Sequence, residues 1–113
     1  MFELRSLSNK LFLKNELYSL KMEEGIKMIE HVSTFNRYIA NLQRLDEVYK
    51  SEDKAVMLLT SLPLSYKHFC TTLMLSKRTL KYEEVMQDIL THHQMVQHFE
   101  ESYQSEGFVA KTG

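Results

Sequence analysis

The stretch from residue 26 to residue 45 has the clearest pattern of apolar and polar positions in the chain. Its apolar residues lie four, three, four and three positions apart: Met28, Val32, Phe35, Ile39 and Leu42. Because 3.6 residues complete one turn of an α-helix, this spacing places all five side chains on one face. We therefore predict an amphipathic helix over residues 26–45.

A second stretch is apolar on nearly every side. It ends at the only proline of the chain and contains Ala55, Val56, Met57, Leu58, Leu59 and Leu62. Pro63 cannot donate a backbone hydrogen bond and disfavours helical geometry in the residue before it, so a helix over residues 52–62 ends there. Ser51 is a suitable N-cap for this helix. We expect its neighbours to enclose it at the centre of the core.

A suitable N-cap at Ser8 and a turn residue at Gly25 bracket a further predicted helix over residues 8–22. Leu11 and Tyr18 are expected on its packing face. Residues 1–7 contain apolar side chains but no helix start before them, and we interpret them as frayed.

Two more helices are predicted after Pro63, over residues 64–75 and 82–105. Gly107 is expected to end the second of them and to leave residues 106–113 as a flexible tail. The core predicted from the five helices consists of Val32, Phe35, Ile39, Leu58, Leu59, Leu62, Leu73, Val85 and Ile89.

Composition favours an all-α fold. Three glycines and one proline among 113 residues leave little material for the turns of a sandwich or barrel, whereas Leu, Met, Lys, Glu and Gln are plentiful. We predict a bundle of about five helices with a long C-terminal helix. Its organisation is expected to be an N-terminal helix in residues 1–25, interpreted as the end of a preceding lobe, followed by a helical lobe over residues 26–105.

Charge and cysteine content limit the partners and the compartment. Lys and Arg number 14 against 15 Asp and Glu, and they are scattered along the chain, so nothing requires nucleic acid or an anionic membrane as partner. The single cysteine, Cys70, cannot form an internal disulfide, which is typical of a reducing compartment. No apolar run approaches the roughly 20 residues of a membrane span. We therefore expect a cytoplasmic protein.

Histidine and cysteine spacing does not predict a reactive site. A helical metal pair needs ligands three or four residues apart, but His92, His93 and His98 differ by one, five and six positions. Cys70 and His68 are two apart, which points their side chains away from each other on a helix. We predict no catalytic residue, metal ligand, cofactor or small-molecule substrate.

Several motifs occur in a characteristic order. They are residues 17–25 (LYSLKMEEG), His31 with Phe35, residues 52–66 (EDKAVMLLTSLPLSY), residues 71–73 (TTL), residues 79–80 (TL) and residues 83–85 (EEV). In this order and spacing the chain resembles the Gag polypeptide of copia-type LTR retrotransposons over roughly residues 8–90. A fainter similarity, through His31, Val32, Phe35 and Ile39, reaches the C-terminal lobe of retroviral capsid proteins.

This resemblance implies a capsid protein that self-associates into virus-like particles around RNA and has no catalytic activity. The positions shared by the core and the family motif are His31, Val32, Phe35, Ile39, Leu58, Leu59, Leu62, Pro63 and Tyr66. Family members often have glycine after the second helix, where this chain has Asp46. The family's zinc knuckle is absent, so RNA is expected to bind here only weakly or through other parts of the polypeptide.

The alternative function is that of a host-adopted Gag relative. Such a chain would act as a helical dimerisation or protein-interaction module that co-assembles with other Gag chains and interferes with them. Particle growth with concentration would favour a capsid protein, and a discrete dimer would favour this alternative.

The last predicted helix carries a narrow apolar seam. Its members lie three, four, three and four residues apart: Ile89, His92, Val96, Phe99 and Tyr103. A seam of this width is typical of helix pairing, so we predict a homodimer through it, with helix exchange as one route. The competing interpretation is that the helix folds back on its own lobe. In the dimer, protonation of two facing His92 side chains would weaken association on mild acidification.

Overall fold

The computed structural model describes the backbone of residues 2–76 and 79–112, and the side chains of residues 5–76 and 79–99. None of the described residues forms a β-strand. The elements in chain order are α1 (Phe2–Ser19), α2 (Met28–Gln43), α3 (Ser51–Thr60), the 3₁₀ helix η1 (Leu64–Tyr66), α4 (Lys67–Ser76) and α5 (Tyr82–Thr112). The prediction of an all-α bundle with a long last helix is confirmed.

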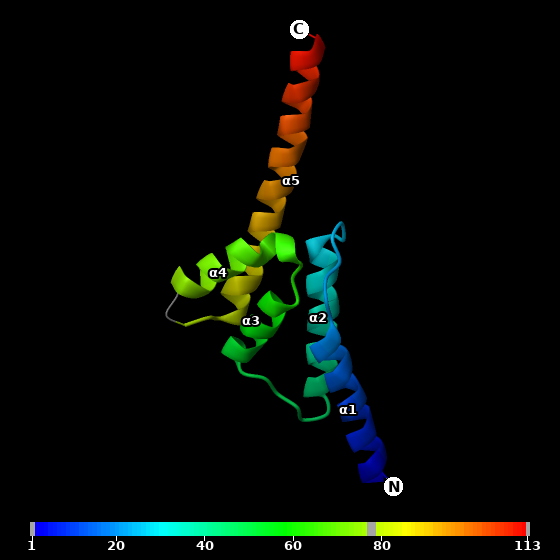
Figure 1. Ribbon diagram of the computed structural model, residues 1–113. Helices are drawn as coiled ribbons and strands as arrows, with labels where there is room; N and C mark the ends of the chain where they lie inside the picture. The colour runs from blue at the N-terminus through cyan, green and yellow to red at the C-terminus, as the bar shows by residue number, and fades with distance from the viewer. Residues whose placement is uncertain (1, 77–78, 113) are drawn as a thin grey trace.

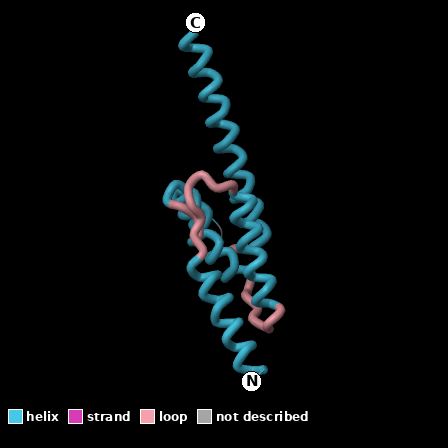
Figure 2. The backbone as a smooth tube through the Cα atoms, turned by 90° about the vertical axis from the view of Figure 1, so that its right-hand side faces the viewer, coloured by secondary structure: helices cyan, strands magenta, loops and turns pink. Residues whose placement is uncertain are grey.

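Helices α1 and α2 form an antiparallel hairpin, and α5 packs against both α2 and α3 (Figure 1). The first part of α1 and the last part of α5 project from opposite ends of the molecule in both views (Figures 1 and 2). The longest dimension is therefore 73 Å and the radius of gyration is 18.1 Å. A compact domain of this size would have a radius of gyration of about 13 Å.

One core joins all the helices. Its buried residues are Leu17, Met22, Met28, Val32, Phe35, Leu42, Ala55, Leu58, Leu59, Tyr66, Cys70, Leu73, Tyr82, Val85 and Ile89. Of the nine positions expected in the core, Ile39 and Leu62 are only partly buried and pack against this cluster. Leu17 and Met22 come from the N-terminal segment, so α1 shares its core with the rest of the chain.

The prediction that residues 52–62 form an enclosed helix at the centre of the core is wrong in its detail. Helix α3 buries Ala55, Leu58 and Leu59, but Val56 is 38% exposed. Helix α3 packs mainly on α5, whereas α2 contacts both α1 and α5. The central position therefore belongs to α2 and α5, because α2 contacts two helices and α3 leaves Val56 partly open to solvent.

Several predicted helix ends are also wrong. Helix α1 begins at Phe2 rather than after Ser8, because residues 2–7 contain no glycine or proline to interrupt it. Helix α5 continues through Gly107 to Thr112 instead of ending near Ser105. A single glycine inside a helix costs only about 1 kcal/mol relative to alanine, which does not by itself end a helix.

Ser51 does not cap the helix that it begins. Helix α3 has no side-chain hydrogen bond at its N-cap, Lys50. The Ser51 hydroxyl instead accepts a hydrogen bond from the backbone N–H of Tyr82, at 2.7 Å. Tyr82 is the first residue of α5 and its N–H has no partner within that helix, so Ser51 satisfies a donor of a different element.

Two connections adopt left-handed backbone geometry. Gly25, in the turn between α1 and α2, has φ of 89°, which glycine adopts without steric cost. Asp46, in the turn after α2, has φ of 63°. The resemblance noted in the sequence implies that many relatives have glycine at this position.

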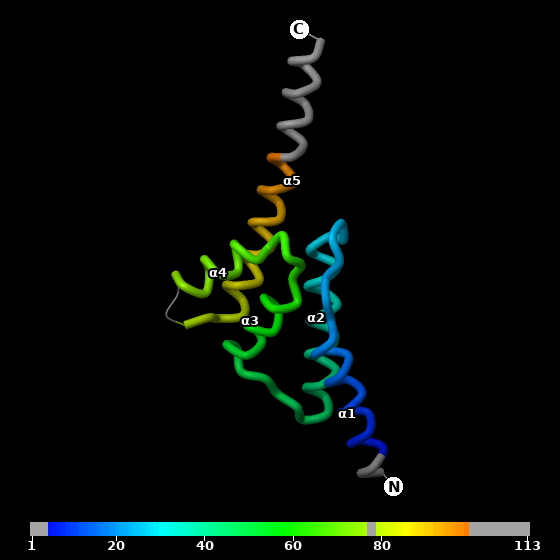
Figure 3. Tube along the Cα trace, in the orientation of Figure 1, coloured from blue at the N-terminus to red at the C-terminus, as the bar shows by residue number. Residues whose placement is uncertain are grey.

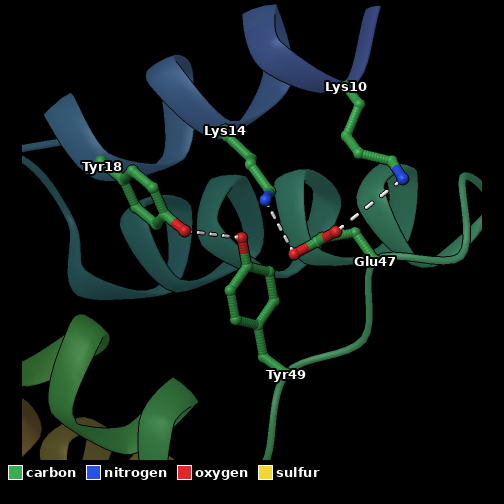
Figure 4. Close-up of polar contacts among 5 residues, drawn as sticks. All are labelled: Lys10, Lys14, Tyr18, Glu47 and Tyr49. Carbon is green, nitrogen blue, oxygen red and sulfur yellow. Dashed lines mark hydrogen bonds and ion pairs between the residues drawn. The ribbon is translucent and has the colours of Figure 1, made fainter. Parts of the chain in front are cut away.

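Polar contacts attach α1 to the segment that joins α2 to α3 (Figure 4). The Glu47 carboxylate lies 2.9 Å from Lys14 Nζ and 3.9 Å from Lys10 Nζ. The hydroxyl oxygens of Tyr18 and Tyr49 are 3.0 Å apart. The hydrogen bond to Glu47 is the main cause that raises the pKa of Lys14, and burial is the main cause that raises the pKa of Tyr49. These contacts orient the half of α1 that lies next to the core.

Candidate self-association surface

The predicted seam on α5 begins inside the protein's own core. Val85 and Ile89 have no solvent exposure. Ile89 packs within its own lobe and cannot at the same time contact a second chain. The first member of the seam is therefore a core residue.

His92, the second member, is engaged by its own lobe as well. Its ring stacks on Phe69 of α4, with centroids 4.2 Å apart and planes at 17°. It also lies edge-on to Tyr66 of η1, at 5.7 Å. Burial, and then the charge of His93, lower the pKa of His92. This packing disagrees with the prediction that two His92 rings face each other across a dimer, because the ring already has aromatic neighbours in its own chain.

The next members lie on the surface. Val96 is 37% exposed and Phe99 is 72% exposed. Met95, which the sequence analysis did not single out, is 57% exposed beside them. The side chain of Tyr103 lies outside the described residues. We call Met95, Val96 and Phe99 the α5 apolar patch.

A second apolar surface lies on α1, which the sequence analysis assigned to packing. Leu7, Leu11 and Tyr18 are more than half exposed, and their spacing of four and seven residues places them along one side of the helix. Phe12, also exposed, lies on the opposite flank. Leu13, Leu17 and Leu20 face the core instead. We call Leu7, Leu11 and Tyr18 the α1 apolar stripe.

His31, a family-motif residue near the start of α2, lies where three segments of the chain meet. His31 and Ser61 are the buried polar residues among those described, with 4% exposure each, and His31 Nε2 lies 2.7 Å from Ser61 Oγ. Because the Ser61 hydroxyl donates to the carbonyl of Leu58, it accepts from the Nε2–H of His31. The Ser61 carbonyl accepts from the N–H of Met22, at 2.8 Å. Burial lowers the pKa of His31. The sequence analysis identified His31 but not Ser61, which occupies an ordinary helix-end position in the sequence.

Two further motif residues, Pro63 and Tyr66, lie in the segment between α3 and α4. Pro63 precedes η1 in extended geometry, and Tyr66 is 8% exposed. The Tyr66 hydroxyl lies 2.6 Å from Nδ1 of His93 on α5. The motif after α3 therefore provides a docking point for α5.

The described part of the chain has no candidate metal cluster, and its cysteine is buried. Among residues 5–76 and 79–99, no three His, Cys, Asp or Glu side chains could hold a metal ion together. Cys70 is buried, its Sγ lies 3.6 Å from the carbonyl oxygen of Leu59, and burial raises the pKa of its thiol. A buried thiol of raised pKa is a poor nucleophile. In the described residues, no helix has the length and hydropathy needed to cross a membrane.

Comparison with known proteins identifies the class. A family model for the gag-polypeptide of LTR copia-type elements matches residues 1–102. The chain belongs to this family, and the resemblance seen in the sequence is confirmed. Membership of a Gag family indicates a structural, non-enzymatic role.

One relative is a much longer polyprotein. The chain is 40% identical over 91 residues to the "Retrovirus-related Pol polyprotein from transposon TNT 1-94" of Nicotiana tabacum. The match covers 80% of this chain and 7% of that polyprotein. No solved structure matches the chain significantly.

Proposed function

We propose that this chain is a capsid-building Gag segment that self-associates into the shell of a copia-type particle. The observation that carries the proposal is the α5 apolar patch, since Met95, Val96 and Phe99 are exposed on a helix that extends beyond its own lobe. Exposed apolar side chains grouped on one element are typical of protein–protein contact sites. Family membership supports the same role.

The α1 apolar stripe supports a growing assembly rather than a closed pair. A two-fold dimer uses one self-complementary surface, whereas a shell needs at least two contacts on each subunit. The α1 stripe and the α5 patch lie on the two helices that project from opposite ends (Figure 1). Each chain would therefore offer two separate surfaces to further Gag chains.

Sedimentation velocity over a range of concentrations tests the proposal. The wild type is expected to form dimers and larger species as concentration rises. The double variant Val96→Asp with Phe99→Asp is expected to remain monomeric, because it places two charges within the apolar contact.

The matched control is Gln87→Asp with Gln94→Asp, which adds the same charge at exposed positions of α5 on the side away from the patch. It should assemble like the wild type. A wild type that stays monomeric, or assembly that is indifferent to the Val96 and Phe99 changes, would refute the role of the patch. A discrete dimer that never grows would favour a host-adopted interaction module.

A further inference from the structure

We propose that His92 and His93 form a latch that holds α5 against its own lobe, and that mild acidification releases the latch through His92. The inference goes beyond assembly, because it concerns how a single chain positions its last helix. It does not depend on particle formation.

Three aromatic contacts make up the latch. His92 stacks on Phe69 at 4.2 Å and lies edge-on to Tyr66, as described above. The His93 ring lies nearly parallel to that of Tyr66, with centroids 6.4 Å apart, and its Nδ1 is hydrogen-bonded to the Tyr66 hydroxyl. The two histidines thus connect α5 to η1 and α4.

Burial along α5 ends at the latch, and the helix then runs on beyond the other helices (Figure 3). One turn earlier Ile89 is fully buried, and His92 and His93 are half-buried. All described residues after them, 94–99, are exposed. Loss of the two imidazole contacts would therefore free the end of the docked part of α5 without opening the Ile89 contact first.

Protonation of His92 is unfavourable in this geometry. Its half-buried ring stacks on Phe69, so an imidazolium charge there would be partly withdrawn from water. The buried Nε2 of His93 has no hydrogen-bond partner among the described residues. A cavity of about 270 Å³ borders both rings, which gives water a route to them once α5 moves.

Some charged groups around the latch favour protonation of His92 and others oppose it. Glu24, from the turn between α1 and α2, lines the same cavity and accepts a hydrogen bond from Ser65 at 3.1 Å. Asp88 precedes His92 by one turn of α5 and has interactions of its own. Both carboxylates favour imidazolium, whereas Lys67 and His68, exposed at the start of α4, oppose it when charged.

The balance at His92 favours release in acid. Burial and the charge of His93 lower its pKa in the docked state, so the undocked state binds protons more tightly. Docking is then fully stable above the ordinary histidine pKa of about 6.5 and weakens as the pH falls below it.

Hydrogen exchange of the full chain at pH 7.5 and 5.5, corrected for the intrinsic rate, tests the latch. In the wild type, protection of the amides in residues 90–97 should fall several-fold more than that of residues 83–88. His92→Phe with His93→Gln should remove this difference, because Phe keeps the stack on Phe69 and Gln keeps a hydrogen-bonding group near Tyr66, and neither titrates. Val32 and Phe35 report global unfolding in the same samples.

Equal loss of protection in wild type and variant, or no loss in either, would overturn the proposal. If the double variant does not fold, proton NMR titration of wild-type His92 decides. A measured pKa below about 6.5, with a parallel change in the Phe69 ring signals, supports the latch. A pKa at or above that value refutes it.

Discussion

At the scale of single residues, Asp46 shows how a family preference follows from backbone geometry. Its φ of 63° lies in the left-handed region, where glycine has no steric cost and aspartate is tolerated better than most residues. A glycine, which the family resemblance implies for many relatives at this position, would therefore suit the turn after α2. The sequence shows that this chain has Asp46 where glycine was expected, and the backbone geometry explains why aspartate is accepted there.

Substitution at Asp46 should follow this geometry. Asp46→Val is expected to lower the free energy of unfolding by about 1–2 kcal/mol, because a β-branched side chain is strained in this conformation. Asp46→Gly should raise it by up to about 1 kcal/mol. Urea denaturation followed by circular dichroism measures both, with Asp46→Asn as the matched control. If valine is tolerated like asparagine, residue 46 does not have this conformation.

His31 is expected to make the folded chain less stable in acid, in addition to the effect of His92. Burial lowers its pKa in the folded chain, so below the ordinary value of about 6.5 the unfolded chain takes up the proton first. Stability due to neutral His31 is complete above that pH and declines below it.

Urea midpoints at pH 7.5 and 5.5 should differ less in His31→Gln than in the wild type. Glutamine does not titrate and can still donate to Ser61. The remaining difference is expected to include the contribution of His92. An unchanged pH dependence in the variant would show that His31 is not a source of acid sensitivity.

At the scale of elements, α3 is buried less evenly than its nearly continuous run of apolar residues predicts. Leu59 is 3% exposed, whereas Val56, three residues earlier on the same helix, is 38% exposed. An apolar run predicts burial on every side, but burial depends on which neighbours are present. Helix α3 packs on α5 with Ala55, Leu58 and Leu59 buried, and Val56 lies at the edge of that buried face.

Leu59→Ala is expected to lower the free energy of unfolding by about 2–5 kcal/mol, because it leaves a cavity in the core. Val56→Ala, on the same helix, should cost clearly less. Thermal and urea unfolding of both variants compare the buried face of α3 with its exposed edge directly. Equal losses would mean that α3 is enclosed after all.

At the scale of the whole molecule, the number and order of helices could be predicted, because each interruption has a local cause such as Gly25 or Pro63. The face of α1 that packs on the core could not be predicted, because apolar residues occur on all sides of that helix. The burial of Ile89, the first member of the α5 seam, could not be predicted either. The spacing of the seam continues from Ile89 to Phe99 without a break, and nothing local marks where the lobe ends beside it.

The hydrogen bond from Tyr82 to Ser51 has a consequence for how the chain folds. It joins the beginnings of α3 and α5 and closes a loop of 31 residue positions that contains η1 and α4. The first turn of α5 gains this partner only after that loop has closed, and loop closure has an entropic cost that local helix formation does not have. The segment from α3 to the start of α5 should therefore gain and lose its structure as one cooperative unit, while the far end of α5 can form and fray independently.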